Sequence, residues 1–427
     1  MPIMRNFLKT RLSIMVFMEY AVWGSYLISI GVYLSSIGLG NRIGWFFAAQ
    51  GLVSLFMPAL IGVVADRWIK PQLLYSACHF LSALFMALMS FRCAAGYVGF
   101  EDIFPYYCLS IVFFMPTVAL SNSICFTSLQ KAGIDVQNSF PRIRMFGTIG
   151  FICAMWVVNF LGIQASYLQF LLRAGLGVLL VIYSFSLPDC TVEGNEPKRS
   201  VAAIMGIKAF HLFRRKDMAV FFIFSMLLGV CLQISNGYAS PYIDSFAVLE
   251  EYSNAFFVKN SILLISLSQI SEAFCLLLLP FCLKRFGIKR VIIISLLAWS
   301  ARYALLGFGN PKTEVWMFIL SMVFYGVAFD FFNIAGSMYV DRNTDCRTRS
   351  CGQGLFMMMT NGFGASIGML TVQYVVNLYT DSVSFGNRFY TVGDWKTAWL
   401  WFAFFAFALA LLFSVTFKSN EKDRVRD

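Results

Sequence analysis

The chain has 427 residues, of which 59% are hydrophobic and only 13% are charged, and its mean hydropathy is +0.71. A soluble globular protein carries about 25% charged residues, so this composition excludes a soluble globular domain. The net charge of +11 would suit nucleic-acid binding, but the positions of the basic residues along the chain argue against it.

Long apolar runs separated by polar breaks predict an all-α membrane protein of about twelve helices, because one bilayer crossing takes about 20 residues. The first run is too long for the apolar region of a signal peptide and lacks a cleavage site of small residues, so we expect it to be retained. The predicted spans lie near residues 11–36, 44–65, 72–92, 103–130, 142–163, 166–188, 218–245, 255–283, 291–310, 314–340, 353–380 and 394–417.

The basic residues lie mainly on one side of this predicted topology. With the N-terminus inside, the inner side holds about 25 of the 33 lysines and arginines, and two more fall within spans. This bias predicts that both termini are cytoplasmic and that the surplus charge faces anionic lipid. The few basic residues of the outer connectors are Arg42, Arg92, Lys259, Lys312, Arg388 and Lys396.

A long hydrophilic connector at 189–217 divides the spans six and six. We therefore expect an N-terminal six-helix bundle at 1–188, a cytoplasmic central loop, and a C-terminal bundle with a short cytoplasmic tail at 218–427. Part of the connector, IMGIKAFHLFRR, has apolar residues at helical spacing and a basic end, which favours a position on the inner membrane surface. Two six-span halves are typical of transporters that bind their substrate between the halves, near the middle of the membrane.

The connector after the second span reads GVVADRWIK and resembles the loop signature of the major facilitator superfamily. A carboxylate beside a cation at a helix end can hold neighbouring helices in one state and release them in another. The corresponding loop of the second half, LKRFGIKR at 283–290, has a basic residue in place of the aspartate, so a latch there would be weaker. An ordinary positive-inside loop is the alternative for both. The residues of the predicted conformational latch are Gly62, Asp66, Arg67 and Lys70.

Several charged residues fall inside the predicted spans. A charge at the centre of a bilayer costs at least about 2.5–3.5 kcal/mol by insertion scales, so such a residue usually faces a cavity or a partner. Glu272 and Asp330 are the strongest candidates, because a carboxylate there must be protonated, paired or bound to a ligand. An acid that changes its protonation with conformation is what a proton-coupled carrier needs. The full set is Glu19, Arg144, Arg173, Glu272, Arg302 and Asp330.

Polar and aromatic residues accompany these charges at spacings that share a helical face. Amide, carboxylate and guanidinium groups can hold a hydroxylated ligand while aromatic rings stack on a flat one, which favours a sugar joined to a planar heterocycle. The candidates are Arg144, Thr148 and Phe151 in the fifth span, Gln233 and Asn236 in the seventh, Gln269 and Glu272 in the eighth, and Tyr325, Phe329, Asp330 and Asn333 in the tenth.

Each candidate also has a simpler interpretation. Amides in membrane spans often bond only a neighbouring helix, and phenylalanines at helical spacing usually pack. Arg144 can belong to the inner connector, while Arg173 and Arg302 can extend to the interface or pair structurally. Neither the eleven cysteines nor the two histidines have the spacing of a metal site. We therefore expect no metal, no cofactor, no catalytic residues and no enzyme activity.

The chain also contains the segments VWGSYL, MPALIGVVADRW, FPRIRMFGTIGF, FFIFSMLLGVCLQISN, SQISEAF, FYGVAFDFFNIAGS and QGLFMMMTNGFG. Together they closely resemble the bacterial nucleoside:proton symporters of the major facilitator superfamily, over nearly the whole chain. The resemblance implies twelve helices in two six-helix bundles and nucleoside uptake driven by the proton gradient. It also implies that Asp330 takes part in transport, and that the ligand is held by Arg144, Thr148, Phe151, Gln233, Asn236, Gln269, Glu272, Tyr325 and Phe329.

One departure from the resemblance is Glu19, which stands where an uncharged Gln is expected and which can alter coupling or substrate range. We expect a monomeric importer in the bacterial inner membrane whose partners are a nucleoside, protons and membrane lipid, without nucleic acid. Proton coupling is assigned to Asp330 and Glu272. The alternatives are a major facilitator carrier for another small polar solute, such as a sugar, or a drug/proton antiporter.

Overall fold

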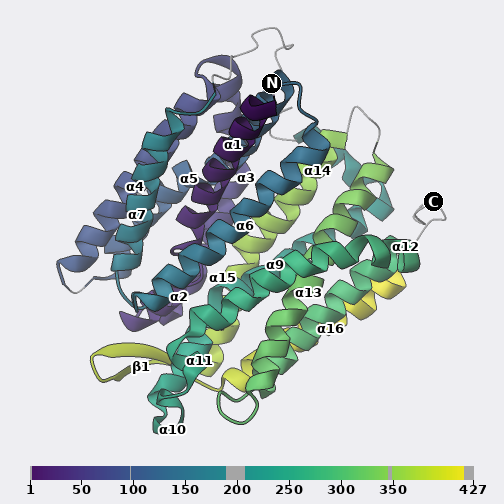
Figure 1. Ribbon diagram of the computed structural model, residues 1–427. Coiled ribbons are helices and arrows are strands. Elements are labelled where there is room, and N and C mark those ends of the chain that lie inside the picture. Colours follow the sequence, from purple (N-terminus) through teal and green to yellow (C-terminus); the bar gives the residue numbers. More distant parts are fainter. Residues whose placement is uncertain (1, 97, 189–206, 345–348, 418–427) are drawn as a thin grey trace. The chain divides into compact units, whose positions relative to one another are not determined.

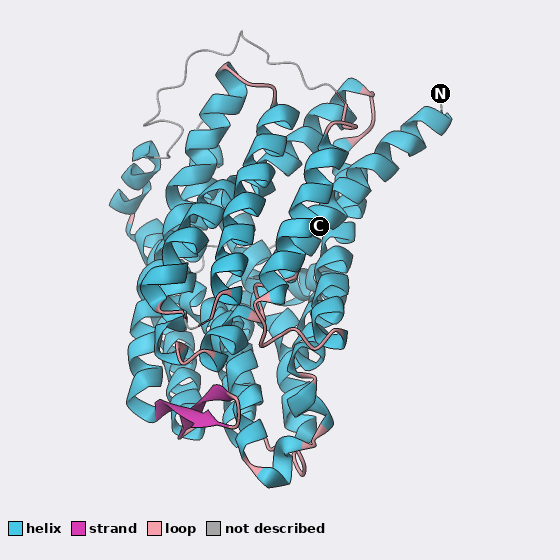
Figure 2. Cartoon of the chain, turned by 90° about the vertical axis from the view of Figure 1, so that its left-hand side faces the viewer, coloured by secondary structure: helices cyan, strands magenta, loops and turns pink. Residues whose placement is uncertain are grey.

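The computed structural model describes residues 2–96, 98–188, 207–344 and 349–417. These ranges form helices, apart from one two-stranded antiparallel hairpin near the C-terminal end (Figures 1 and 2). The chain divides into two compact units, residues 1–33 with 53–205 and residues 34–52 with 206–427. Each unit is described separately.

The first unit is built from long apolar helices. In it α1 packs on α6, and α4 packs on both α5 and α7 (Figure 1). Prolines lie inside α3, α5 and α6, as membrane helices tolerate when neighbouring helices satisfy the freed backbone groups. The helices are α1 (Pro2–Gly24), α2 (Ile30–Ser36), α3 (Ile43–Arg67), α4 (Pro71–Ala94), α5 (Phe100–Lys131), α6 (Val136–Phe160) and α7 (Leu168–Ser184); α2 and α3 each run across the division between the units.

In the second unit, α12 packs against both α13 and α16, and α9 packs on the π-helical segment η4. The helical elements are η1 (Gly40–Arg42), η2 (Ile207–Arg214), α9 (Lys216–Ser245), η3 (Phe246–Val248), α10 (Glu250–Ser253), α11 (Phe256–Lys259), α12 (Ser261–Phe308), α13 (Val315–Asn343), α14 (Arg349–Met357), η4 (Met358–Gly364), α15 (Ala365–Tyr379) and α16 (Trp395–Thr416). The hairpin consists of β1 (Thr380–Phe385) and β2 (Arg388–Gly393), in register from Thr380 opposite Gly393 to Phe385 opposite Arg388.

The predicted class, an all-α membrane protein, is confirmed. Within the described ranges, nine helices are long and apolar enough to cross a bilayer. One of them, α12, contains the predicted eighth and ninth spans on either side of a bend at Gly287, whose φ of 76° interrupts the helix. The predicted first and sixth spans correspond to α1 with α2 and to the shorter helix α7.

Three local features differ from the sequence-based expectation. The first span is interrupted by a turn at residues 25–29, and its helix begins at Pro2 rather than near residue 11. The eleventh span contains the π-helical segment η4. The connector before the last span folds into the β1–β2 hairpin, which was not predicted because its apolar and polar residues do not alternate regularly along both strands.

Candidate functional site

The residues singled out from the sequence belong to both units. Arg144, Thr148 and Phe151 lie on α6 in the first unit. The second unit holds the other polar and aromatic candidates, on α9, α12 and α13: Gln233, Asn236, Gln269, Glu272, Tyr325, Phe329, Asp330 and Asn333.

In the first unit, α6 presents its polar and aromatic stripe beside α1. The guanidinium of Arg144 lies over the ring of Tyr20, 4.0 Å from its centre. Phe151 meets Trp23 edge to face, with ring centres 6.5 Å apart, and Thr148, which precedes Phe151 by about one turn of α6, is half-buried. Small residues allow this close crossing, because a Cβ at Gly24 would come within 2.5 Å of the Phe151 carbonyl oxygen. Arg144 is therefore held against a helix of the bundle rather than extended with the inner connector.

In the second unit, a seam of small residues joins α12 and α13. The Ser271 hydroxyl donates to the Val323 carbonyl over 2.6 Å, and a Cβ at Gly326 would lie 2.6 Å from the Ser271 carbonyl oxygen. Such close approach of two backbones is typical of membrane helices that meet through small residues. Because Glu272 directly follows Ser271 and Tyr325 directly precedes Gly326, the seam places these two side chains on adjoining helices.

Tyr325 is the centre of a polar group within the second unit. Its ring lies against Phe329 with an interplanar angle of 16° and ring centres 5.7 Å apart. Gln269, Glu272, Arg302 and Asp330 interact with its side chain. The structure thus brings together residues of the eighth and tenth predicted spans that the sequence could only assign to separate helices.

Asp330 is buried and interacts electrostatically with a second acid, Glu272. Its side chain is 4% exposed, and among the described residues its Oδ2 has no hydrogen-bond partner. Glu272 is half-buried. Two carboxyl groups that share one site cannot both be ionised without a Coulomb cost, which suits them to hold a proton.

Arg302 links α9 to this group. Its guanidinium donates to the Ser235 hydroxyl over 2.7 Å and to the Ser321 carbonyl over 2.6 Å, and it lies 4.9 Å from the centre of the Tyr325 ring. Arg173 of the first unit is held similarly, by Ser82 and Ser110. Both arginines are almost fully buried, with Arg302 0% and Arg173 1% exposed. The interpretation in which they extend to the membrane interface is therefore wrong, and both bind other helices instead.

The seventh predicted span contributes a buried amide on α9. Gln233 precedes the Ser235 that Arg302 contacts by two residues, and Asn236 directly follows it. Gln233 is buried, and its Oε1 has no hydrogen-bond partner among the described residues, whereas Asn236 is half-buried. A buried acceptor that lacks a partner costs about 1–3 kcal/mol, which a hydroxylated ligand can recover.

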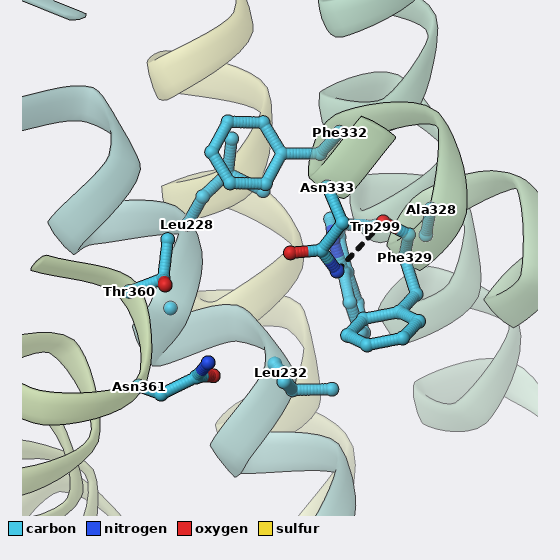
Figure 3. A pocket seen from close by; sticks show the side chains of 10 residues that line it. Leu228, Leu232, Trp299, Ala328, Phe329, Phe332, Asn333, Thr360 and Asn361 are labelled. Carbon is cyan, nitrogen blue, oxygen red and sulfur yellow. Dashed lines mark hydrogen bonds between the residues drawn. The ribbon is translucent and has the colours of Figure 1, made fainter. Parts of the chain in front are cut away.

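A small pocket in the second unit adds residues that sequence reasoning did not select. It is bounded by α9, α12, α13 and η4, with Asn333 on one side and Thr360 and Asn361 on the other (Figure 3). Asn333 donates to the Phe329 carbonyl over 3.1 Å. π-Helical turns such as η4 often mark functional sites. The missed residues are Trp299, Thr360 and Asn361; the last two lie in the segment QGLFMMMTNGFG that carries part of the resemblance.

The predicted conformational latch lies at the junction of α3 and α4. Gly62 is in the last turns of α3, where a Cβ would meet nothing within 4 Å, and Lys70 precedes the first turn of α4. The side chains of Asp66 and Arg67 lie outside the part of the chain whose side chains the structure describes.

Comparison with known proteins gives a consistent result. A family model described as nucleoside H⁺ symporter matches residues 6–422. The nucleoside permease NupG and the xanthosine permease of Escherichia coli (strain K12) are each 39% identical to the chain, over 96% of both partners. A crystal structure of the nucleoside transporter NupG superposes with a TM-score of 0.87 at 38% identity, covering 97% of this chain and 100% of that one.

Proposed function

We infer that this chain, which belongs to the nucleoside H⁺ symporter family, imports nucleosides together with protons. It is a multi-pass membrane protein with the major facilitator fold. The observation that carries the proposed mechanism is the polar group around Tyr325, in which amide, carboxyl and aromatic side chains from α12 and α13 meet. This combination suits a ribose joined to a flat base.

In the proposed site, Gln269 and Glu272 bind mainly the ribose hydroxyls. Carboxylate and amide oxygens accept from such hydroxyls, and hydrogen bonds to a charged acceptor are about twice as strong as neutral ones. The nearly parallel rings of Tyr325 and Phe329 offer a surface on which a base can stack. The proposed remaining contacts, which orient the ligand, are Gln233, Asn236, Arg144, Thr148 and Phe151.

The proton is assigned to Asp330 and Glu272. Their electrostatic interaction within a buried setting supports this role. Binding of a proton removes the repulsion between the two acids, and loss of the proton restores it, so protonation biases one conformation over another. Alternating access then results from rocking of the bundles 1–188 and 218–427 about the site. Among the described residues no group of three or more metal-ligating side chains is present, and neither a cofactor nor covalent chemistry is part of the proposal.

The proposed setting is the bacterial inner membrane, with both termini cytoplasmic and the protein acting as a monomer surrounded by lipid. This orientation follows from the distribution of basic residues. It puts the latch Gly62, Asp66, Arg67 and Lys70 on the cytoplasmic side, where it is proposed to hold the helix ends α3 and α4 in one state of the cycle.

Uptake of labelled uridine into proteoliposomes tests this function. With an inward proton gradient, the wild-type protein is expected to accumulate uridine above the outside concentration, and without the gradient only to equilibrate it. Glu272→Gln removes the charge while keeping the size, and it is expected to reduce gradient-driven uptake at least about tenfold, because a charge-assisted hydrogen bond to the ribose is worth about 1.5–3 kcal/mol.

The matched control is Glu251→Gln, which changes an exposed glutamate of the same unit that pairs with Lys312 over 3.4 Å. It is expected to transport as the wild type does. If the wild type fails to concentrate uridine under the gradient, symport is excluded, and competition by glucose would indicate a sugar carrier instead. If Glu272→Gln transports normally, the role given to that side chain is wrong.

A further inference from the structure

The first unit contains a buried cluster of ionisable side chains that the proposed transport site does not use. A carboxylate from α1 meets three donors from α4 and α5. Glu19 Oε2 accepts from the Tyr75 hydroxyl over 2.6 Å and lies 2.7 Å from His79 Nε2, while Glu19 Oε1 accepts from Thr117 over 2.7 Å. We call the four residues Glu19, Tyr75, His79 and Thr117 the Glu19–His79 cluster; none is more than 1% exposed.

The hydrogen bonds of this cluster do not fix the charge of the histidine. Nε2 of His79 faces the carboxylate, but Nδ1 is buried and has no hydrogen-bond partner among the described residues. The same geometry therefore accommodates both charge states of the ring. Nδ1 carries a lone pair in the neutral ring and a proton in the charged ring, and neither form breaks a hydrogen bond among the described residues. Histidine is the side chain whose charge changes most readily near neutral pH.

The surroundings contain one further charge that balances Glu19. Arg173 on α7 interacts with Glu19, yet its own hydrogen bonds go to Ser82 and Ser110 rather than to an acid. With His79 neutral, the charges of Glu19 and Arg173 cancel, and with His79 protonated the interior of the unit gains one positive charge. The other ionisable groups near the cluster are Tyr20 on α1, with Arg144 of α6 over its ring, Cys78 on α4 and Cys125 on α5.

The cluster is joined through α1 to the proposed nucleoside contacts of α6. Phe17, two residues before Glu19, leaves no room for a side chain at Gly150, because a Cβ there would clash with the Phe17 carbonyl oxygen. One residue beyond Glu19, Tyr20 carries the Arg144 guanidinium on its ring. Because the backbones of α1 and α6 are in close contact there, a shift of α1 relative to α4 and α5 also displaces α6.

We propose that the Glu19–His79 cluster is a second proton-binding site, and that its protonation changes the affinity for nucleosides through α1 and α6. The inference rests on the proposed function, because it requires that α6 contacts the nucleoside. It differs from the proposed coupling at Asp330 and Glu272, which lie in the other unit. Binding linkage is reciprocal, so a nucleoside must change the proton affinity of the cluster by the same factor.

Nuclear magnetic resonance of the full-length protein in micelles, with ¹³C-labelled histidine, tests this proposal directly. The chain has only two histidines, and His211 lies in an exposed contact with Arg214. In the variant His211→Gln, the single remaining histidine signal therefore belongs to His79. The chemical shift of the His79 signal is expected to change with pH as the ring gains or loses a proton. The midpoint of this change is expected to move when uridine is added, and the shift is expected to match the part of the pH dependence of the uridine Kd that depends on the cluster.

Variants separate the cluster from a general loss of structure. Glu19→Gln removes the charge that attracts the proton, and it is expected to weaken proton binding at His79 and to reduce the pH dependence of the uridine Kd, leaving only the part that Asp330 and Glu272 contribute. Asp102→Asn is the matched control in the same unit, because Asp102 pairs with Arg92 at the surface, and it is expected to leave both measurements unchanged.

The outcomes distinguish failure of the second proton site from failure of the proposed function. If wild-type protein binds uridine but the His79 signal shows no titration, or a titration that uridine does not move, the second proton site is excluded while the proposed function stands. If the protein binds no uridine at any pH, the proposed function fails, and the His79 titration still decides whether the cluster binds a proton. The measurement on the protein with an intact cluster does not depend on Glu19→Gln, so the proposal can still be tested if that variant misfolds.

Discussion

Glu19 of the first unit and Asp330 of the second are both buried, and each unit also buries an arginine, but the two acids differ in their hydrogen-bond partners. Glu19 in the first unit receives three hydrogen-bond donors, whereas Asp330 in the second has an oxygen without a partner among the described residues and a second carboxyl group nearby. The arginines are alike, since Arg173 and Arg302 both donate to serines. This incomplete hydrogen bonding supports the proposal that Asp330 exchanges the proton that is coupled to transport, since a buried polar atom without a partner calls for an explanation.

Removal of the acid that lacks partners is expected to have the largest effect. Asp330→Asn keeps the size but cannot exchange a proton, so gradient-driven accumulation of uridine should fall at least about tenfold, to the equilibrium level. Exchange of labelled for unlabelled uridine without a gradient should persist. Accumulation and counterflow in proteoliposomes measure the two, with Asp217→Asn, at an exposed ion pair with Arg215, as control. Accumulation by Asp330→Asn equal to wild type would contradict the contrast drawn between the acids.

The two arginines sharpen the comparison. Arg173→Gln and Arg302→Gln each orphan buried serine or carbonyl groups, at about 1–3 kcal/mol per group, so both should lower the Tm by roughly 2–6 °C. Only Arg302 lies over Tyr325, so Arg302→Gln should raise the uridine Kd about tenfold and Arg173→Gln less than about threefold. Thermal denaturation and equilibrium binding check this, and equal losses of affinity would show that Arg302 has no special relation to the ligand.

Tight helix crossings occur in both units and give a smaller effect. A Cβ at Gly150 would clash with the Phe17 carbonyl oxygen, and a Cβ at Gly229 would clash with the Thr360 carbonyl oxygen. Gly150→Ala and Gly229→Ala are therefore each expected to cost about 1–3 kcal/mol of stability through overpacking. Gly175→Ala is the control, since a Cβ there meets nothing within 4 Å. Thermal denaturation in detergent provides the measurement, and a Tm of either clashing variant equal to the control would show that these crossings can separate freely.

The smallest effect on stability is expected at a solvent-exposed acid that caps a helix. Asp394 caps α16 by accepting from the Thr397 amide over 3.0 Å, and this hydrogen bonding lowers the pKa of its carboxyl group. A lowered pKa means that the cap stabilises the helix above the pKa of the unfolded chain, and that this contribution is lost as the pH falls below about 4.

Asp394→Ala should therefore lower the Tm by no more than about 2 °C at pH 7, with a smaller difference from wild type at pH 3. Thermal denaturation at the two pH values checks this, and Asp381→Ala, at an exposed position of β1, serves as control. A difference that grows toward acid pH would contradict the assigned sign.

The sequence alone determined the class of the protein and the location of its spans, because the length of an apolar run and the positions of charges are local properties. It also selected Glu272, Asp330 and their neighbours at helical spacing, since residues three or four apart share a face of any helix. The family resemblance supplied the nature of the ligand, which spacing alone restricted only to a sugar joined to a flat ring.

Only the tertiary structure decided which faces meet. Glu19 and His79 are 60 residues apart in the chain, and their pairing depends on how α1 packs against α4. The same holds for the Ser271–Gly326 seam, for the serines that hold Arg302, and for the π-helical segment η4. Contacts between helices depend on the fit of small and large side chains over the whole bundle, and no periodicity within one helix carries that information.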